Sequence, residues 1–410
     1  MINTAKWQET EIGRIPEEWG LVKIGDLFFV KNGKTNTQDA VTNGKYPLFD
    51  RSTQIKSSNK YLFDSEAIIM PGEGKEFVPH YFSGKFDLHQ RVYAITPKTK
   101  KICVKFFYYW MYYYRNYLSR IAVGSTVKSL RLGHLISFPA PNPTLTEQET
   151  ITKTLSDLDS KIELNNQMNA TLEAMAQAIF KHWFIDFEFP DENGKPYKSS
   201  GGKMVESELG EIPEGWEVGK IGEITKYIRD QVLPYQNTNK NYNHYSIEAY
   251  DIGMRPISQL GAEILSNKFI VHNNTILVSK LNPRIRRIWP VIIVKENGIC
   301  STEFLVFKPN DIEFCYFYGL ISTNILWENL IQKARGTSSS HQRISADDIL
   351  NILVPIPPQN ILKSYEKVLL PYLVKRENNI SVQTILQQTR DSLLPKLMSG
   401  QIRVPVEVAK

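Results

Sequence analysis

The chain has 410 residues and a formal net charge of +6, and 42% of its residues are hydrophobic and 22% charged. These are the proportions of a globular protein long enough for two or three cored domains. Its three cysteines, Cys103, Cys300 and Cys315, form no CxxC pair, so neither a zinc site nor a disulfide framework is indicated. The first residues lack the apolar region of a signal peptide, and we therefore expect a cytoplasmic protein with reduced thiols.

The first predicted element is an opening segment that occurs twice. Residues 11–27 (EIGRIPEEWGLVKIGDL) match residues 208–224 (ELGEIPEGWEVGKIGEI) at nine of seventeen positions, with an offset of 197. Two later blocks repeat with larger offsets of 212 and 214, namely 89–97 with 301–309 and 129–186 with 343–400. A duplicated chain can fold with approximate two-fold symmetry, which is also the symmetry of duplex DNA. The growing offset predicts constant ends around two dissimilar inserts.

Short strands are predicted inside both inserts, separated by Gly, Asn and Pro turns. They occupy 67–70 and 92–95 in the first half, and 275–278, 291–294 and 304–307 in the second. Strand-like runs are thus predicted in both halves of the chain.

An aromatic run follows these strands in each half, at 105–118 and near 314–332. The first run is too short to span a membrane and contains Lys105 and Arg115, so no membrane partner is expected. Its repetition favours a packed core helix, and a platform on which bases stack is the alternative. A proline-rich stop, SFPAPNPTL or NILVPIPPQ, then closes each insert.

After each stop, apolar or small residues recur at alternating steps of four and three, which is typical of a coiled-coil seam. The first seam covers 151–183, and its copy 214 residues later covers 365–397. Thr146 is a plausible first residue of the first helix, which would be roughly 55–60 Å long. Asn165 and Asn379 occupy equivalent seam positions, where a buried amide fixes helix register. The internal copy favours pairing of the two helices within one chain over dimerisation of two chains.

Catalytic motifs are absent from the sequence. There is no [ND]PP[YF] motif for adenine methylation, and the GKT at 33–35 lacks the upstream glycine of a Walker A loop. The Pro190-Asp191 pair and the Glu73-Gly74-Lys75 tripeptide do not combine into a nuclease motif, and the seven histidines form no HExxH or HxxxH pair. We therefore expect no catalytic residues and no metal site on this chain.

Several motifs together make the chain resemble one family, the specificity (S) subunits of type I restriction-modification systems. These motifs are the twin openings, the link at 180–220, the exits GSTVKSL (124–130) and GTSSSHQRIS (336–345), and the terminal LLPKLMSGQI (393–402). The resemblance covers essentially the whole chain. It implies an α+β fold with two α/β target-recognition domains, separated by two long antiparallel coiled-coil helices, and a pseudo-two-fold internal repeat.

The resemblance also implies domain boundaries. They are recognition domain 1 at 1–145, the central helix at 146–187, a polar linker at 188–205, recognition domain 2 at 206–358, the C-terminal helix at 359–402 and a tail at 403–410.

The implied function is recognition of a bipartite, asymmetric DNA sequence without bond making or breaking. In this family each recognition domain recognises half of the target, and the helices carry the modification (M) subunits, expected to be two. Restriction (R) subunits join in the full complex. No cofactor is expected on this chain, because S-adenosylmethionine belongs to the M partner and ATP with Mg to the R partner. The alternatives are a coiled-coil assembly protein whose recognition domains no longer bind DNA, and a self-sufficient enzyme.

Basic and polar loop residues are the candidates for DNA contact, because Lys and Arg bind phosphates and polar side chains recognise base edges. In the first half they are Lys31, Asn32, Lys34, Arg51, Lys75, His89, Gln90, Arg91, Ser125, Thr126 and Lys128. In the second half they are Lys280, Asn282, Arg284, Arg286, Arg287, Ser338, Ser339, Ser340, His341, Gln342 and Arg343. The alternatives are that 280–287 is a solvated loop, that 89–91 only begins a strand, and that the Ser/Thr loops only form turns. If Arg286 and Arg287 contact phosphate, their removal flattens the salt dependence of binding.

Overall fold

The computed structural model describes residues 6–52, 54–74, 76–310, 313–335 and 342–404. The chain divides into two compact units. Unit 1 comprises residues 1–162 and 385–410, and unit 2 comprises residues 163–384. Each unit contains one recognition insert and parts of two long helices, so the duplication seen in the sequence corresponds to a duplication in structure. Within the described ranges, no helix is both long enough and apolar enough to cross a membrane.

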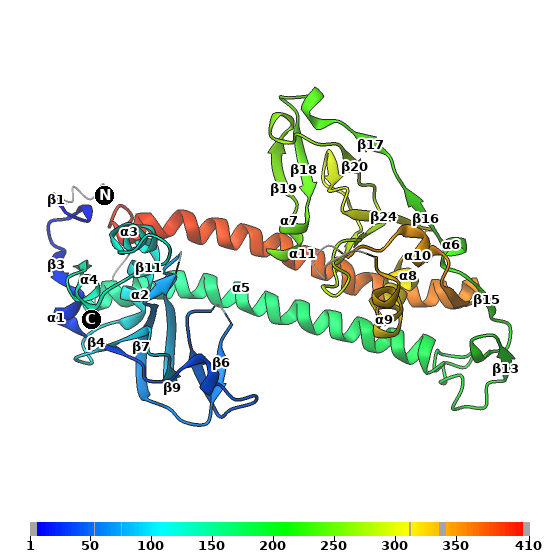
Figure 1. The fold of residues 1–410 in the computed structure, drawn as a ribbon, viewed down its shortest axis with the longest axis horizontal. Helices are drawn as coiled ribbons and strands as arrows, with labels where there is room; N and C mark the ends of the chain where they lie inside the picture. Colours follow the sequence, from blue (N-terminus) through cyan, green and yellow to red (C-terminus); the bar gives the residue numbers. More distant parts are fainter. Residues whose placement is uncertain (1–5, 53, 75, 311–312, 336–341, 405–410) are drawn as a thin grey trace. The chain divides into compact units, whose positions relative to one another are not determined.

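A six-stranded sheet in the order β4-β10-β7-β9-β5-β6 forms the centre of unit 1 (Figure 1). Its strands are β4 (Phe28–Asn32), β5 (Tyr46–Phe49), β6 (Lys56–Ser58), β7 (Phe63–Pro71), β9 (His80–Leu88) and β10 (Val92–Pro97). All neighbours are antiparallel except β5 and β9. Because side chains alternate along a strand, Ile68 and Met70 join one hydrophobic cluster, and Ala67 and Ile69 join another. The sheet is therefore apolar on both faces.

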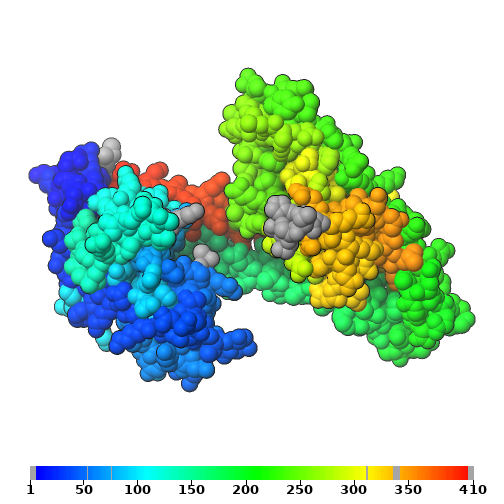
Figure 2. Space-filling model, in the orientation of Figure 1, coloured from blue at the N-terminus to red at the C-terminus, as the bar shows by residue number. Residues whose placement is uncertain are grey.

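The aromatic run of unit 1 forms α2 (Val104–Tyr113) and α3 (Arg115–Ile121). Phe106, Phe107 and Trp110 are at most 1% exposed and belong to the same cluster as Ile68 and Met70. The Trp110 indole also donates a hydrogen bond of 3.0 Å to the backbone carbonyl of Pro139. These rings are core side chains, so the alternative of a base-stacking platform does not apply to them. In the space-filling view, the insert of unit 1 forms one continuous surface over this core (blue to cyan in Figure 2).

Short elements surround the unit 1 sheet. They are β1 (Trp7–Thr10), β2 (Gly13–Pro16), β3 (Gly20–Lys23), α1 (Ile24–Leu27), η1 (Thr37–Asp39), β8 (Glu73–Gly74), β11 (Lys128–Ser129), α4 (Leu132–Ile136) and β12 (Pro139–Asn142). The proline-rich stop becomes β12, which pairs only with β3. Proline has no backbone N–H to donate to a ladder and is therefore confined to strand edges, and this two-stranded pairing accommodates it.

Unit 2 contains two sheets in place of one, a four-stranded sheet β16-β24-β21-β22 and a five-stranded sheet β17-β20-β23-β18-β19. Its strands are β13 (Met204–Ser207), β14 (Gly210–Pro213), β15 (Glu217–Lys220), β16 (Thr225–Ile228), β17 (Gln231–Val232), β18 (Asn241–Tyr245), β19 (Ile257–Leu260), β20 (Lys268–Ile270), β21 (Thr275–Ser279), β22 (Ile288–Val291), β23 (Gly298–Cys300), β24 (Phe304–Pro309) and β25 (Leu353–Ile356). Its short helices are α6 (Ile221–Ile224), η3 (Pro234–Gln236), α7 (Ile247–Asp251), η4 (Gly261–Glu263), α8 (Phe314–Ser322), α9 (Asn324–Lys333) and α10 (Ala346–Leu350). The inserts differ in sheet topology as well as in length.

The parts flanking the inserts are built alike in the two units. In unit 1 β3 pairs with β12, and the Ile24 N–H donates to the Phe138 carbonyl at 2.9 Å. In unit 2 β15 pairs with β25, and the Ile221 N–H donates to the Ile352 carbonyl at 3.0 Å. These four residues are related by the sequence offsets of 197 and 214. A constant frame therefore holds two dissimilar inserts, as the drifting offset predicts.

Two long helices, α5 (Leu145–Phe180) and α11 (Gln359–Met398), pass through both units, and a π-helical turn, Lys181–Ile185, follows α5. In unit 1, Asp159 of α5 accepts a 2.8 Å hydrogen bond from Arg390 of α11. In unit 2, Asn169 accepts from Asn379 at 2.9 Å, and Asn166 accepts from Gln383 at 2.7 Å. Since residue numbers rise on one helix as they fall on the other, the helices are antiparallel (Figure 1). The expected α+β fold with an internal repeat and two long antiparallel helices is confirmed.

The helix seam is apolar at its ends and polar in between. Ile151, Leu155, Tyr365 and Leu369 are fully buried. Asn379, a predicted seam amide, is only 3% exposed and donates to Asn169. An amide pair in an apolar seam satisfies its hydrogen bonds in one register only. The pair therefore specifies how the two helices align.

Candidate nucleic-acid interface

Several of the candidate residues of unit 1 lie near the end of β7. The Gly72 N–H donates to the Arg91 carbonyl at 2.9 Å, and the Gly72 carbonyl accepts from the Leu130 N–H at 2.9 Å. Next to Gly72, β8 pairs with β11, so Lys128 lies opposite Gly74. The structure therefore brings together a strand end, the turn at 89–91 and the exit loop, which are far apart in the sequence.

An acidic side chain organises the cations at this place. Glu73 accepts hydrogen bonds from Arg51 at 2.9 Å and from Arg91 at 2.8 Å. The hydrogen bond from Arg91 lowers the pKa of Glu73, and the charge of Arg51 lowers it further. The ionised carboxylate thus holds two half-exposed guanidinium groups side by side. Such a pair can exchange a carboxylate for a phosphate, because both anions bind guanidinium in the same geometry.

Amide side chains form a second group at the rim of unit 1. The Asn32 amide donates to the Gln90 carbonyl at 3.2 Å, and the Gln90 amide donates to Asn36 Oδ1 at 2.7 Å. Asn32 and Gln90 are exposed, as are Lys31 and Lys34 on either side of Asn32. Gly33 allows the close approach, because a Cβ there would lie 1.9 Å from the Leu88 carbonyl oxygen. The result is an exposed row of amides flanked by lysines.

The remaining predicted residues of unit 1 differ in their exposure. His89 is buried, its Nδ1 accepts from the Arg91 N–H at 3.0 Å, and burial lowers its pKa. Ser125 and Thr126 are exposed in the exit loop, and Lys128 donates to the Ser119 carbonyl at 2.7 Å. Lys75 lies outside the described residues. DNA contact by any of them stays a prediction, and the His89 ring supports the turn from within.

Unit 2 repeats the backbone arrangement with different side chains. The Lys280 N–H donates to the Glu303 carbonyl at 2.9 Å, and the Lys280 carbonyl accepts from the Ile344 N–H at 3.0 Å. Lys280, Glu303 and Ile344 thus take the places of Gly72, Arg91 and Leu130. Glu303 is therefore an acidic residue at the place where unit 1 has Arg91.

An ion pair joins Arg343 to Glu303 in unit 2, with nitrogen–oxygen distances of 3.2 and 3.3 Å. Arg284 is exposed in a turn that is closed by a 2.9 Å hydrogen bond from the Ile285 N–H to the Asn282 carbonyl. Asn282 itself has a φ of 49°, which asparagine tolerates well, and its N–H donates to the Gln342 carbonyl at 2.8 Å. The turn therefore presents Arg284 outward beside the exit loop.

Arg286 and Arg287 point in another direction from Arg284. Arg287 is 8% exposed and binds Asp251 through two hydrogen bonds of 2.7 and 2.9 Å. Arg286 donates to the Ser322 carbonyl at 2.7 Å and to Asn324 Oδ1 at 2.9 Å. Both guanidinium groups are thus engaged by the protein. Ser338, Ser339, Ser340 and His341 lie outside the described residues.

Sequence reasoning missed the acidic residues of these sites. In the sequence, Glu73 belongs to a tripeptide that does not complete a nuclease motif. Glu303 belongs to a repeated block. Their arginine partners are 18 to 40 residues away in the chain, so no local pattern reveals the pairing. The described part of the chain contains no group of three or more His, Cys, Asp or Glu residues that could hold a metal ion.

Comparisons with known proteins agree with this duplicated arrangement. A family model described as the type I restriction modification DNA specificity domain matches residues 16–174 and again residues 213–379. The type I restriction enzyme MjaIX specificity subunit of Methanocaldococcus jannaschii is 25% identical, over 97% of this chain and 97% of its own length. The EcoDI specificity subunit of Escherichia coli is also 25% identical, over 95% of this chain and 90% of its own.

A solved structure has a similar fold. The crystal structure of the type I restriction-modification system S subunit from M. genitalium matches with a TM-score of 0.63 and 17% sequence identity, covering 97% of each chain. The family model matches most of both halves of the chain, so the sequence assigns the family, and the solved structure shows a similar fold. The chain belongs to the family of type I restriction-modification specificity subunits.

Proposed function

We propose that this chain recognises a bipartite, asymmetric DNA sequence, with each unit recognising one half. The observation that carries the proposal is one backbone arrangement with two different sets of polar side chains. Gly72 and Lys280 make equivalent hydrogen bonds, yet the neighbouring exposed groups are amides, lysines and two arginines bound to Glu73 in unit 1, and Arg284 with the Glu303-bound Arg343 in unit 2. Equivalent placement supports two DNA-binding sites, and unequal side chains support two different half-sites.

The chemistry of the two sites suggests what each can recognise. Amide side chains such as Asn32 and Gln90 can donate to and accept from adenine in the major groove, whereas Arg284 suits guanine or a phosphate. The surrounding lysines and arginines supply the part of the affinity that depends on salt. Recognition requires no bond chemistry, in keeping with a non-catalytic subunit.

The long helices are the proposed docking surface for two modification subunits. In unit 2, Leu164, Met168 and Met175 of α5 are 36–55% exposed and lie on one side of the helix, four and seven residues apart. Val374 and Val382 of α11 are also exposed. Apolar helix surfaces of this kind suit a helical partner. S-adenosylmethionine would be bound by the modification partners, and ATP with Mg by restriction subunits, in the cytoplasm.

A binding experiment tests this proposal against a purely structural role. The chain, co-purified with its modification partners, is titrated with random-sequence DNA and with DNA that contains the cognate site. We expect cognate DNA to bind about a thousandfold or more tightly at moderate salt. Equal affinity for both DNAs would identify a scaffold that has lost DNA recognition. The isolated chain should neither methylate nor cleave DNA, and turnover by it alone would refute the non-catalytic assignment.

A further inference from the structure

The basic loop at 280–287 contains arginines with two kinds of surroundings. Arg284 is exposed at the turn. Arg287 is buried and forms a bidentate pair with Asp251, the last residue of α7. The side chain of Arg287 is 10% exposed and that of Asp251 is 44% exposed, so solvent reaches the carboxylate more than the guanidinium. A DNA phosphate could therefore bind the Arg287 guanidinium only by displacing Asp251 from it.

Arg286 is bound at the end of α8. Its guanidinium donates to the carbonyl of Ser322, the last residue of α8, and to the Asn324 side chain, and it lies 5.5 Å from the ring centre of Trp327. A helix end has unsatisfied carbonyls and a partial negative charge, and both favour a cation there. Burial lowers the pKa of Arg286, as expected for a cation held inside the protein.

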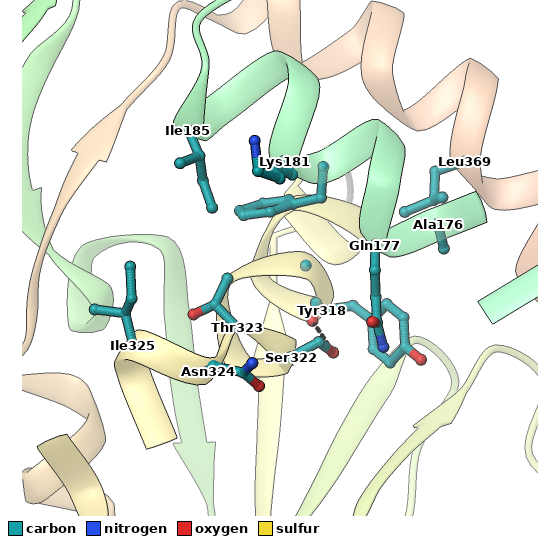
Figure 3. Close-up of a pocket in the computed structure, with 12 residues that line it drawn as sticks. Ala176, Gln177, Lys181, Ile185, Tyr318, Ser322, Thr323, Asn324, Ile325 and Leu369 are labelled. Atoms are coloured by element: carbon teal, nitrogen blue, oxygen red, sulfur yellow. Dashed lines mark hydrogen bonds between the residues drawn. The ribbon is translucent and has the colours of Figure 1, made fainter. Parts of the chain in front are cut away.

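The part of α8 that accepts a hydrogen bond from Arg286 is connected to the long helices. The Ser322 hydroxyl donates to the Tyr318 carbonyl at 2.7 Å, as the dashed line in Figure 3 marks. The Tyr318 hydroxyl donates to Glu173 of α5 at 2.7 Å, and Glu173 lies 3.8 Å from Arg376 of α11. A polar cavity of about 170 Å³ is lined by these groups.

The other side of α8 faces an apolar cavity. This cavity, of about 330 Å³, lies between the end of α8 and Ile185 of the π-helical turn (Figure 3). α8 also packs directly on α5, where Gly319 lies against the Phe180 ring, and the polar groups on the first side add the hydrogen-bonded link from Arg286 to α5.

We propose that Arg286 and Arg287 are positioning residues that hold the basic loop in place and do not contact DNA themselves. Arg287 fixes the loop to α7, and Arg286 fixes it to α8, which is bonded to α5. With both held, the loop keeps one conformation in which Arg284 is exposed beside the half-buried Lys280 and Asn282. This inference rests on the proposed function, since it assigns roles within the DNA-binding site of unit 2.

The salt dependence of DNA binding separates positioning from phosphate contact. Affinities of the complex with modification subunits are measured for cognate DNA over a range of salt concentrations. Arg284→Ala, which removes an exposed cation, should flatten the slope of log K against log salt by about 0.9 if it contacts a phosphate. Arg286→Ala and Arg287→Ala should leave the slope unchanged and weaken cognate binding by about tenfold, the cost of one lost base contact. Flattening of the slope by both variants would overturn the proposal.

Asp251 provides a second test with opposite expectations. If Arg287 positions the loop, Asp251→Asn weakens cognate binding, and the exchange Asp251→Arg with Arg287→Asp restores part of it. If Arg287 contacts phosphate, Asp251→Asn releases a guanidinium, and binding becomes tighter. Tighter binding would therefore overturn the proposal.

Methylation of variant half-sites shows whether the effect is local. Arg287→Ala should relax the sequence preference at the half-site of unit 2 and leave the other half-site unchanged. Relaxation at both half-sites would indicate general unfolding and would contradict a positioning role, and thermal unfolding of each variant complex provides the control. Failure of the wild-type complex to prefer cognate DNA would instead refute the proposed function.

Discussion

At the scale of single residues, the two candidate interfaces depend on acidic side chains that hold arginines in place. Glu73 binds Arg51 and Arg91 in unit 1, and Glu303 binds Arg343 in unit 2. The half-exposed pairs add little to stability. They keep each guanidinium at the rim of the interface and occupy it until a phosphate takes the place of the carboxylate.

Neutralising Glu73 should strengthen DNA binding. Glu73→Gln removes a carboxylate that occupies two guanidinium groups, so Arg51 and Arg91 become available to phosphates. We expect higher affinity for random-sequence DNA and a salt slope steeper by roughly one unit per released arginine. Glu76→Gln is the matched control, because Glu76 is an exposed neighbour with the same charge. Equal behaviour of the two variants would place Arg51 and Arg91 away from DNA.

Asp50 predicts a pH-dependent contribution to the stability of unit 1. Burial alone would raise the pKa of Asp50, but hydrogen bonds from Lys56 and Ser52 outweigh it and lower the pKa to about 2, from 3.8. Because the folded pKa is depressed, the stabilisation of about 2 kcal/mol is present above pH 4 and is lost as the pH falls towards 2.

Asp50→Asn should therefore lower the free energy of unfolding by about 2 kcal/mol at pH 6, with the difference from wild type vanishing near pH 2. Denaturant unfolding across this pH range measures it. Asp64→Asn, whose ion pair with Lys85 is 3.8 Å long and exposed, should show almost no difference. A constant penalty at every pH would contradict the role of the Asp50 charge.

At the scale of elements, the two long helices could be predicted from the sequence, and the sheets of the two inserts could not. The helices were predictable from the sequence, because their buried residues recur at a fixed local period and the copy at offset 214 has the same phase. The sheets were not, since the order β4-β10-β7-β9-β5-β6 requires β5 to pair in parallel with β9, far along the chain. The inserts share no sequence pattern that could indicate their different topologies.

Each unit is fastened to the helices by a tyrosine, an acid and an arginine. Tyr109 donates to Asp159, which also binds Arg390. In unit 2, Tyr318 donates to Glu173, which lies near Arg376. In both units the acid is on α5 and the arginine is on α11. The sequence gives no hint of these triads, because their members are far apart in the chain.

The buried amide pair of the helix seam gives a prediction at this scale. Asn379→Leu leaves Asn169 without its partner in the seam and should destabilise unit 2 by about 1–3 kcal/mol. The double variant Asn169→Leu with Asn379→Leu should recover most of this loss, because replacing both partners removes the unsatisfied group. Denaturant unfolding of both variants measures the coupling. Additive losses would contradict a direct interaction between the two amides.

At the scale of the whole molecule, duplication supplies two equal frames and divergence supplies two unequal sites. The frame hydrogen bonds, Ile24 to Phe138 and Ile221 to Ile352, recur at the offsets of the sequence repeat, so this part was predictable. Which loop residues meet at the site was predicted only in part. Arg51 and Arg91 meet at Glu73, whereas Arg286 and Arg287 turn inward, and whether a side chain in a basic loop points outward depends on partners elsewhere in the fold.

The measurement that tests the central claim most directly is methylome sequencing of a host that expresses this chain with its modification partners. We expect methylated adenines in one motif made of two different half-sites, separated by a spacer of fixed length without sequence preference. A spacer of fixed length follows from one register of the long helices, and different half-sites follow from different inserts. A single contiguous motif, two identical half-sites or no methylated motif would contradict the account.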